Sequence, residues 1–135
     1  MPPHIRLALG PDDFPTVITT RGHTLRSDEP ASSGGSDTGP EPFEVLLASL
    51  GACTAITLRM YARRKGWALD GVQIDAGFDP NEGRRLIRMT VSCDGDLTPD
   101  QRDRLLQIAN ACPVHKALTR GVMVDTRLAD RTSDP

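Results

Sequence analysis

Three cysteines, Cys53, Cys93 and Cys112, are the residues of this chain with the widest range of chemistry. A thiol that loses its proton becomes a nucleophile, which can attack a peroxide or exchange with a disulfide. Cys53 lies in an apolar run without a charged residue between Glu44 and Arg59, a setting that is also typical of a core residue. Cys112 precedes a proline and could cap a new helix, whose free N–H groups would stabilise a thiolate there. Cys93 is expected to serve packing.

The spacing of cysteines and histidines does not favour a metal site. The intervals between successive cysteines are 40 and 19 residues, and no Cys-x-x-Cys pair occurs. Of His4, His23 and His115, only His115 follows a cysteine closely, three residues after Cys112, and two ligands do not make a zinc site. The chain also lacks a P-loop, a Rossmann glycine pattern and a nucleophile elbow. A Cys112–His115 hydrolase stays open as a weaker alternative, because no acid that would orient the imidazole is identifiable.

Composition excludes several classes of partner. The chain has 135 residues, of which sixteen are Lys or Arg and eighteen are Asp or Glu, and it contains only three Phe, one Trp and one Tyr. It therefore lacks the positive excess and the stacking side chains of a nucleic-acid-binding protein. The longest apolar run, residues 45–58, is shorter than the roughly 20 residues that span a membrane, and the N-terminus does not resemble a signal peptide. We therefore expect no membrane association and a reducing cytoplasm, in which the cysteines are thiols.

The elements that must position these cysteines fit into one domain covering residues 1–135. Apolar residues alternate over residues 4–9, a turn signal covers residues 10–13, and a second β-rich run covers residues 16–25, which together predict a hairpin. Residues 30–42 are rich in Ser, Gly, Pro and acidic residues and predict a long flexible loop. Loops of this length are usually functional or disordered, and both interpretations remain open.

A long helix is expected after this loop. Apolar residues recur at intervals of three and four positions, and the basic residues 63–65 followed by Gly66 are a stop signal. The members of the apolar stripe are Phe43, Leu46, Leu50, Cys53, Ile56 or Thr57, and Met60. We expect this stripe to face the core.

A hairpin and a second helix are expected next. Residues 72–78 and 87–93 alternate between apolar and polar types and flank a turn. Thr98 and Gln101 have the spacing of a capping box, with proline at the first helical position. The proline that follows Cys112 should end or kink this helix.

A short helix over residues 114–118 and a last strand over residues 122–128 complete the predicted domain, and residues 130–135 are expected to fray. The predicted order is β-β-α-β-β-α-α-β. It corresponds to an α+β fold in which a mostly antiparallel sheet packs on long helices.

Two segments resemble the cysteine motifs of the OsmC/Ohr family of thiol-dependent peroxidases. The first is GPEPFEVLLASLGAC at residues 39–53, and the second is ANACPVHKAL at residues 109–118. The likeness extends from His23 through Asp28-Glu29-Pro30 to the last predicted strand, and the pair of motifs at this separation is specific. The resemblance implies an OsmC-like fold, an intertwined homodimer in which two sheets enclose the cysteine-bearing helices, and active sites at the subunit interface.

The resemblance also implies a mechanism, in which Cys53 is the peroxidatic cysteine and Cys112 the resolving cysteine. The Cys53 thiolate would displace an alcohol from an organic hydroperoxide and become a sulfenic acid, which Cys112 would convert to a disulfide. An external dithiol, either a small molecule or a lipoylated protein, would reopen the disulfide, and no cofactor is expected. Because a free thiol is only about 3% thiolate at pH 7, a cation is expected beside Cys53.

In this family the cation beside the peroxidatic cysteine is an arginine, and a glutamate at the start of the long helix orients it. Glu44 matches the glutamate by motif, although a first-turn acid is also favoured by the helix dipole alone. The Ohr branch carries its arginine in the first hairpin turn, but residues 10–15 contain none. Arg21 is the best substitute for that arginine, and Arg26 is the next candidate. Residues 21–30 resemble the OsmC-like branch of the family instead of the Ohr branch.

Our first hypothesis is therefore a cytoplasmic, homodimeric antioxidant peroxidase of the oxidative stress response. The alternative is a dimeric module that binds a small hydrophobic ligand in an interfacial cleft, with cysteines that do no chemistry.

Overall fold

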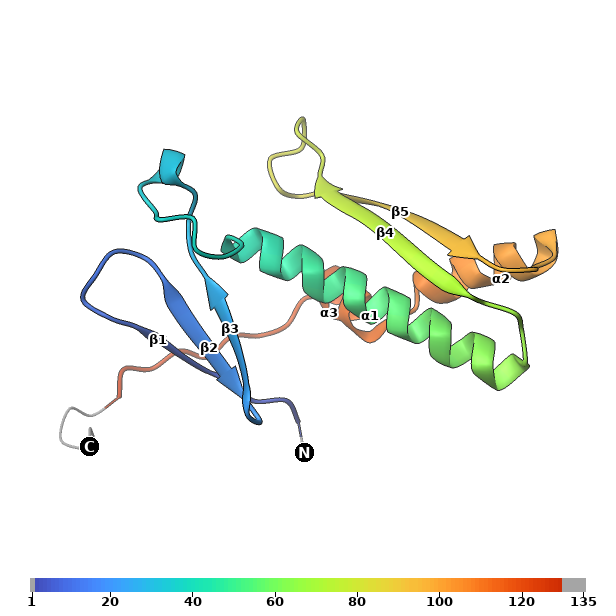
Figure 1. Ribbon diagram of the computed structural model, residues 1–135, viewed down its shortest axis with the longest axis horizontal. Coiled ribbons are helices and arrows are strands. Elements are labelled where there is room, and N and C mark those ends of the chain that lie inside the picture. The colour runs from blue at the N-terminus through green and yellow to red at the C-terminus, as the bar shows by residue number, and fades with distance from the viewer. Residues whose placement is uncertain (1, 130–135) are drawn as a thin grey trace.

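The chain folds into two antiparallel sheets and three α-helices in a computed structural model that describes residues 2–129 (Figure 1). In chain order the elements are β1 (Arg6–Leu9), β2 (Thr16–Thr20), β3 (His23–Ser27), the 3-10 helix η1 (Ala31–Ser33), α1 (Pro42–Lys65), β4 (Gly71–Phe78), β5 (Ile87–Asp94), α2 (Pro99–Ala109) and α3 (Pro113–Arg120). The predicted α+β class with antiparallel sheets is confirmed. The order differs from the prediction at both ends of the chain.

The N-terminal sheet has three strands in the order β1-β2-β3. The predicted hairpin is confirmed, but the run over residues 16–25 is two strands and not one. Arg21 and Gly22, with φ of 47° and 82°, make the two-residue turn between them. Because Arg-Gly is not among the usual sequences for such a turn, the pattern of the sequence did not reveal it.

Helix α1 begins and ends where the sequence predicts. The Glu41 side chain accepts a hydrogen bond from the Glu44 N–H, and the Glu44 side chain accepts one from the Glu41 N–H, which completes a capping box. Gly66 ends the helix in the left-handed conformation, with φ of 71°.

The face that α1 buries is not the whole predicted stripe. Leu50, Thr54, Leu58 and Ala62 are its buried residues, whereas Ile56 and Met60 are 55% and 60% exposed. The helix is apolar on more than one side, so hydrophobic periodicity could not select the side that packs within the chain.

By length and composition, α1 is also the one helix of residues 2–129 that could cross a membrane, and 22% of its most apolar window is buried. A core helix of a soluble protein passes the same test. Much of the apolar surface of α1 is therefore exposed within one chain, and another molecule must cover it.

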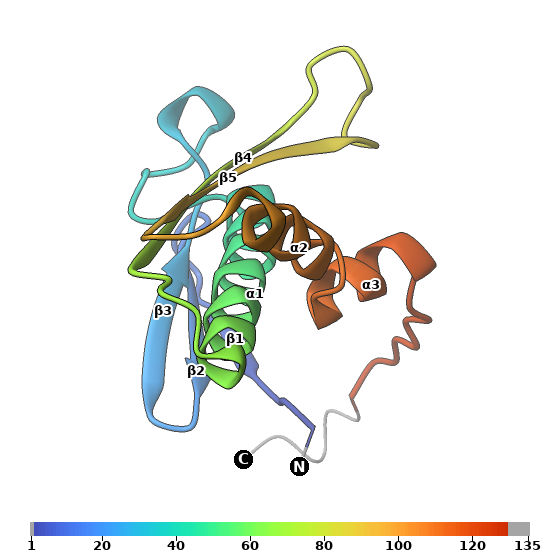
Figure 2. The same ribbon diagram turned by 90° about the vertical axis from the view of Figure 1, so that its right-hand side faces the viewer.

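The core lies where α1 and α2 pack under the β4–β5 hairpin (Figure 2). Its buried members are Leu58, Ala62, Leu69, Leu97, Leu105 and Ala109. Strands β4 and β5 pair along their full length, from Gly71 opposite Asp94 to Phe78 opposite Ile87. The Thr98–Gln101 capping box at the start of α2 is present as predicted.

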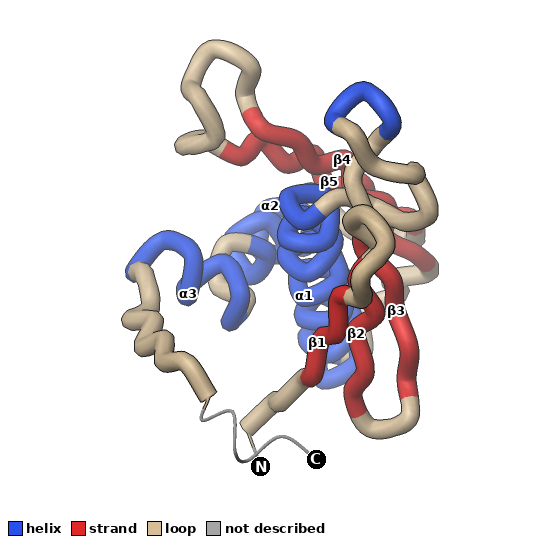
Figure 3. Tube along the Cα trace, turned by 90° about the vertical axis from the view of Figure 1, so that its left-hand side faces the viewer, coloured by secondary structure: helices blue, strands red, loops and turns tan. Residues whose placement is uncertain are grey.

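The predicted last strand is absent. Residues 121–129 leave α3 without regular structure (Figure 3), and Val124 and Leu128 are 82% and 96% exposed. A strand requires a neighbour for its hydrogen bonds, and within residues 2–129 no strand pairs with this segment. The prediction of a frayed tail over residues 130–135 concerns residues outside those described.

The loop that leads into α1 has a defined path around Asp28, which is 2% exposed. The Asp28 carboxylate accepts hydrogen bonds from the N–H groups of Glu29 and Thr38 and from the Thr38 hydroxyl, at 2.7, 3.0 and 2.7 Å. These bonds lower the pKa of Asp28, the Thr38 hydroxyl most strongly, because they favour its charged form. Gly39 fits closely in the same loop, since a Cβ there would lie 2.5 Å from the Arg26 carbonyl oxygen.

Replacement of this glycine is expected to destabilise the protein. Gly39→Ala should lower the free energy of unfolding by about 2 kcal/mol, because the backbone must shift to relieve the contact. Gly10→Ala is the matched control, since its Cβ would meet no atom within 4 Å. Urea unfolding monitored by circular dichroism measures both variants, and equal stability of the two would contradict this account of the loop.

Candidate active site

The fold brings Cys53 and Cys112 together, although they are 59 residues apart in the chain. Cys53 lies in the middle of α1 and is partly exposed, whereas Cys112 is completely buried at the start of α3. Both are free thiols, and the Cys112 thiol is close enough to Cys53 to help raise its pKa. The packing of α3 on α1 thus creates a pair of thiols that could form a disulfide.

Cys112 is the N-cap residue of α3, as its position before Pro113 predicts. Its backbone is extended, with φ of −67° and ψ of 148°, and its Sγ accepts a hydrogen bond from the His115 N–H at 3.3 Å. This bond satisfies one of the N–H groups that the start of a helix leaves free. The sulfur therefore lies at the positive end of the α3 dipole.

A threonine of α1 completes the surroundings of Cys112. Thr54 is completely buried, and its hydroxyl donates to the Leu50 carbonyl oxygen at 2.9 Å. The same oxygen lies 3.7 Å from Cys112 Sγ and 3.9 Å from Met89 Sδ. The sequence pattern did not predict this contact between Thr54 and Cys112.

Burial is the main influence on Cys53 and raises the pKa of its thiol. The Val114 N–H and the Thr57 side chain oppose this rise in pKa, while the Cys112 thiol adds to it. Among the described residues, no charged side chain is one of the main influences. The groups of one chain therefore leave Cys53 mostly protonated at neutral pH.

Glu44 does not reach Cys53 within one chain. It lies nine residues before Cys53 on the same straight helix, which corresponds to about 13 Å along the axis. Its carboxylate accepts the Glu41 N–H at 2.9 Å and so serves as a helix cap.

Arg21 is in the turn between β2 and β3 and not on the second strand, where the sequence analysis placed it. Its side chain is exposed, as is that of Arg26. Within the described chain, the N-terminal sheet makes at most marginal contact with α1. No arginine of that sheet is therefore among the groups that act on Cys53 here.

Cys93 packs against the core, as expected. It pairs with Val72 across the β4–β5 hairpin and lies against the cluster around Leu58. Burial raises the pKa of Cys93, and the nearby Arg102 only partly opposes that rise. This thiol is a poor candidate for a nucleophile.

A pocket of about 530 Å³ lies between α1, the β4–β5 hairpin and the helices α2 and α3, and its lining residues do not include Cys53 or Cys112. Its apolar wall consists of Phe43, Leu46, Leu50, Phe78, Met89 and Val91. Leu50 and Met89 both contact Thr54, and Thr54 in turn contacts Cys112. Thr54 therefore lies between the pocket wall and Cys112. His115 also lines the pocket, and its Nδ1 is buried without a hydrogen bond partner among the described residues.

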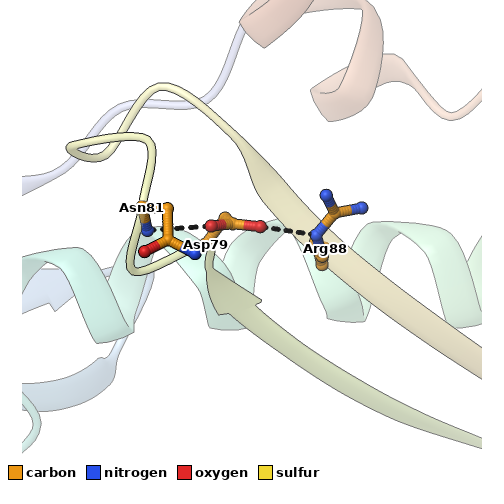
Figure 4. A network of polar contacts seen from close by, with 3 residues as sticks. All are labelled: Asp79, Asn81 and Arg88. Atoms are coloured by element: carbon orange, nitrogen blue, oxygen red, sulfur yellow. Dashed lines mark hydrogen bonds and ion pairs between the residues drawn. The ribbon is translucent and has the colours of Figure 1, made fainter.

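The turn that borders this pocket is held by Asp79 (Figure 4). Its carboxylate accepts hydrogen bonds from Arg88 Nε at 2.7 Å and from the Asn81 N–H at 2.8 Å, and these bonds lower the pKa of Asp79. At the end of the same turn, the Arg84 guanidinium lies over the Phe43 ring, 4.2 Å from its centroid. The ring of Phe78 meets Phe43 edge to face at 5.4 Å.

Residues 34–127 match the family model described as "OsmC-like protein", so the chain belongs to the OsmC-like family. This match covers both cysteine motifs. It confirms the resemblance on which the sequence analysis relied.

A curated relative from Haloferax volcanii, described as an uncharacterized protein, is 31% identical over 93 residues, which are 66% of this chain and 70% of that protein. Among solved structures, a putative osmotic stress induced and detoxification response protein from Psychrobacter arcticus superposes with a TM-score of 0.73 at 18% identity, over 84% of this chain and 85% of the other. The organic hydroperoxide resistance protein OhrB of Bacillus subtilis superposes with a TM-score of 0.57 at 24% identity, over 90% and 92%. At these identities the two structures show that the fold is shared.

Proposed function

We propose that this protein is a thiol-dependent peroxidase that reduces organic hydroperoxides to alcohols. The observation that supports this most directly is the pairing of a partly exposed Cys53 with a buried Cys112 at the start of α3. A peroxide can approach the first sulfur but not the second, which fits the roles of peroxidatic and resolving cysteine.

The proposed reaction has two steps. The Cys53 thiolate attacks the hydroperoxide, the O–O bond breaks, and Cys53 becomes a sulfenic acid while the alkoxide takes up a proton and leaves as the alcohol. The Cys112 thiol then attacks the Cys53 sulfur, an S–S bond forms, and the hydroxyl group leaves as water with the Cys112 proton. An external dithiol, either a small molecule or a lipoylated protein, reduces the disulfide by exchange, so the cycle uses no bound cofactor.

The apolar pocket, whose residues Leu50 and Met89 contact Thr54, supports a substrate with an apolar body. Aromatic and aliphatic side chains line it, and they favour a hydrocarbon tail over a small polar peroxide such as hydrogen peroxide. The name of the Bacillus subtilis protein with the same fold points to the same class of peroxide.

We further propose that the active form is an intertwined homodimer. The N-terminal sheet exposes an apolar face, where Leu7, Ile18 and Leu25 lie opposite one another, and Leu7 and Leu25 are 56% and 58% exposed. The apolar side of α1 and the segment over residues 121–129 are uncovered as well. A second copy would cover all three, and it would give the alternating residues of that segment a strand to pair with.

A second copy is also the proposed source of the missing cation. Glu44 and Arg21 cannot act on Cys53 of their own chain, but both lie at surfaces that the proposed dimer would cover. A guanidinium brought to Cys53 in this way would oppose the effect of burial on its pKa. In this arrangement the protein works in the reducing cytoplasm, where its dithiol reductant is available.

The alternative, a module that binds a hydrophobic ligand, rests on the same pocket but leaves the paired thiols without a role. The Cys112–His115 hydrolase has less support. Within residues 2–129, His115 Nδ1 is buried without a hydrogen bond partner, so no carboxylate of these residues orients the imidazole through that nitrogen.

Peroxide consumption tests the proposed function. Purified protein with dihydrolipoamide should consume cumene hydroperoxide and release cumyl alcohol in equal amounts, and hydrogen peroxide should be consumed more slowly. A ligand-binding module would bind the hydroperoxide without turnover. Failure to consume any organic hydroperoxide with any dithiol would remove the proposal.

A further inference from the structure

The pocket between α1 and the β4–β5 hairpin carries positive charge at one end. Its apolar wall follows α1 and β5, and Arg84 and Arg85 line it at the turn that precedes β5. Of the described residues that line the pocket, none is acidic. Both arginines are exposed, so their guanidinium groups can meet a ligand at the entrance. An apolar cavity with cations at one end is complementary to an apolar molecule that carries an anion.

Neither guanidinium is neutralised by a carboxylate of the described chain. Within residues 2–129 the one ion pair joins Arg88 to Asp79. Arg85 Nε donates to a carbonyl oxygen of its own turn at 3.3 Å, which leaves its terminal nitrogens for a ligand. The Arg84 guanidinium lies over the Phe43 ring, 4.2 Å from its centroid, and this contact uses none of its N–H donors. A carboxylate can bind such a group through two parallel hydrogen bonds.

The turn holds Arg84 in position before a ligand arrives. Gly83 and Arg84 both have a left-handed backbone, with φ of 56° and 66°, a conformation that is uncommon for arginine. The Asp79 carboxylate fixes the turn from within (Figure 4), and the Asp79 N–H donates to the Leu86 carbonyl oxygen at 2.8 Å. Because the turn and the Phe43 ring already order the guanidinium, little conformational entropy is lost when it binds an anion.

We propose that this pocket binds an amphipathic carboxylate, with the carboxylate at Arg84 and Arg85 and the hydrocarbon chain along the apolar wall. The volume of about 530 Å³ lies in the usual range for a small-molecule site and suits a single alkyl chain. The inference goes beyond the proposed function, because neither cysteine of the thiol pair lines the pocket and binding needs no chemistry at sulfur.

His115 is the other group of the pocket that could attract an anion. It lines the pocket from α3, and its Nδ1 is buried without a hydrogen bond partner among the described residues. A carboxylate at that end would meet a single imidazole, whereas the turn before β5 offers two guanidinium groups that are always charged. The end with Arg84 and Arg85 is therefore the stronger site for the anion.

Calorimetric titration of the full chain with decanoate and with decan-1-ol tests the role of the charge. At about pH 7.5 decanoate is ionised, and it should bind about tenfold more tightly than the alcohol of the same length. Arg84→Gln and Arg85→Gln should each weaken the binding of decanoate about tenfold and leave that of decan-1-ol unchanged. Arg84→Gly, which suits the left-handed backbone, replaces the glutamine variant where that does not fold.

Arg64→Gln is the matched control, since Arg64 is an exposed arginine in the last turn of α1 and does not line the pocket. This variant should bind both ligands as the unmodified protein does. Equal affinity for decanoate and decan-1-ol, or no binding of decanoate, would overturn the proposal. A loss of decanoate binding in His115→Gln but not in the variants of Arg84 and Arg85 would overturn the assignment of the anion to the arginines.

The methyl signals of methionine locate the hydrocarbon chain. Met89 lines the pocket, whereas Met60 and Met123 are exposed and do not line it. In protein with ¹³C-labelled methionine methyl groups, both decanoate and decan-1-ol should shift the Met89 signal, which Met89→Leu assigns by its loss. The signals of Met60 and Met123 should stay in place. A shift of Met60 without a shift of Met89 would place the chain on the exposed side of α1 and overturn the proposal.

Neither measurement uses a peroxide or a dithiol. The carboxylate site can therefore fail while organic hydroperoxides are consumed, and it can hold in a protein that consumes none.

Discussion

Cys53→Ser should lower the rate of organic hydroperoxide consumption by about 1,000-fold or more, to the rate of the dithiol alone. The serine hydroxyl is not ionised at neutral pH and is a far weaker nucleophile towards a peroxide than a thiolate. Because Cys53 lies partly exposed on α1, a serine should fit there without loss of the fold. Steady-state consumption of cumene hydroperoxide with dihydrolipoamide measures the effect.

Two other cysteine variants make this experiment specific. Cys112→Ser should still reduce one equivalent of hydroperoxide per chain, since Cys53 can form a sulfenic acid, but it should not form the intramolecular disulfide. Cys93→Ser should keep full turnover, because Cys93 packs against the core away from the pair. Equal activity of Cys53→Ser and the unmodified protein would contradict the assignment of the nucleophile.

Leu25→Glu should convert the dimer to a monomer. Leu25 is 58% exposed within one chain, beside Ile18 on the apolar face of the N-terminal sheet. In the proposed dimer this position is buried, and an unpaired carboxylate there should weaken association by about 100-fold or more. Sedimentation velocity measures the change. Thr24→Glu, on the opposite face of the same strand, is the control and should remain a dimer.

The same variant shows where the cation for Cys53 comes from. In the monomer, burial should hold the pKa of Cys53 above the ordinary value of about 8.5, so its alkylation should be slow at pH 7 and accelerate as the pH rises. In the dimer, a guanidinium from the second copy should lower the midpoint. A monomer and a dimer with the same midpoint would contradict the proposed contribution of the second copy.

Most of the fold could be predicted because local signals were strong. The prolines, capping residues and glycine at the ends of α1 and α2 define those helices without tertiary information. The alternation over residues 72–78 and 87–93 likewise predicted β4 and β5. The N-cap position of Cys112 followed from the proline after it.

The errors have physical reasons as well. The alternating segment over residues 122–128 has no strand beside it in its own chain, and a sequence pattern does not say where a strand finds its partner. The buried side of α1 could not be selected because several of its sides are apolar.

The candidate site was predictable only in part. The motifs identified Cys53 and Cys112, but Glu44 and Arg21 depend on contacts that one chain does not make. Thr54 was missed as a contact of Cys112 because threonine is unremarkable in an apolar helix.

The most direct test of the account is the mass of the protein after one equivalent of cumene hydroperoxide. We predict the loss of two hydrogens per chain and, after digestion without reductant, a peptide pair linked through Cys53 and Cys112. An unchanged mass, or a bridge that involves Cys93, would contradict the account.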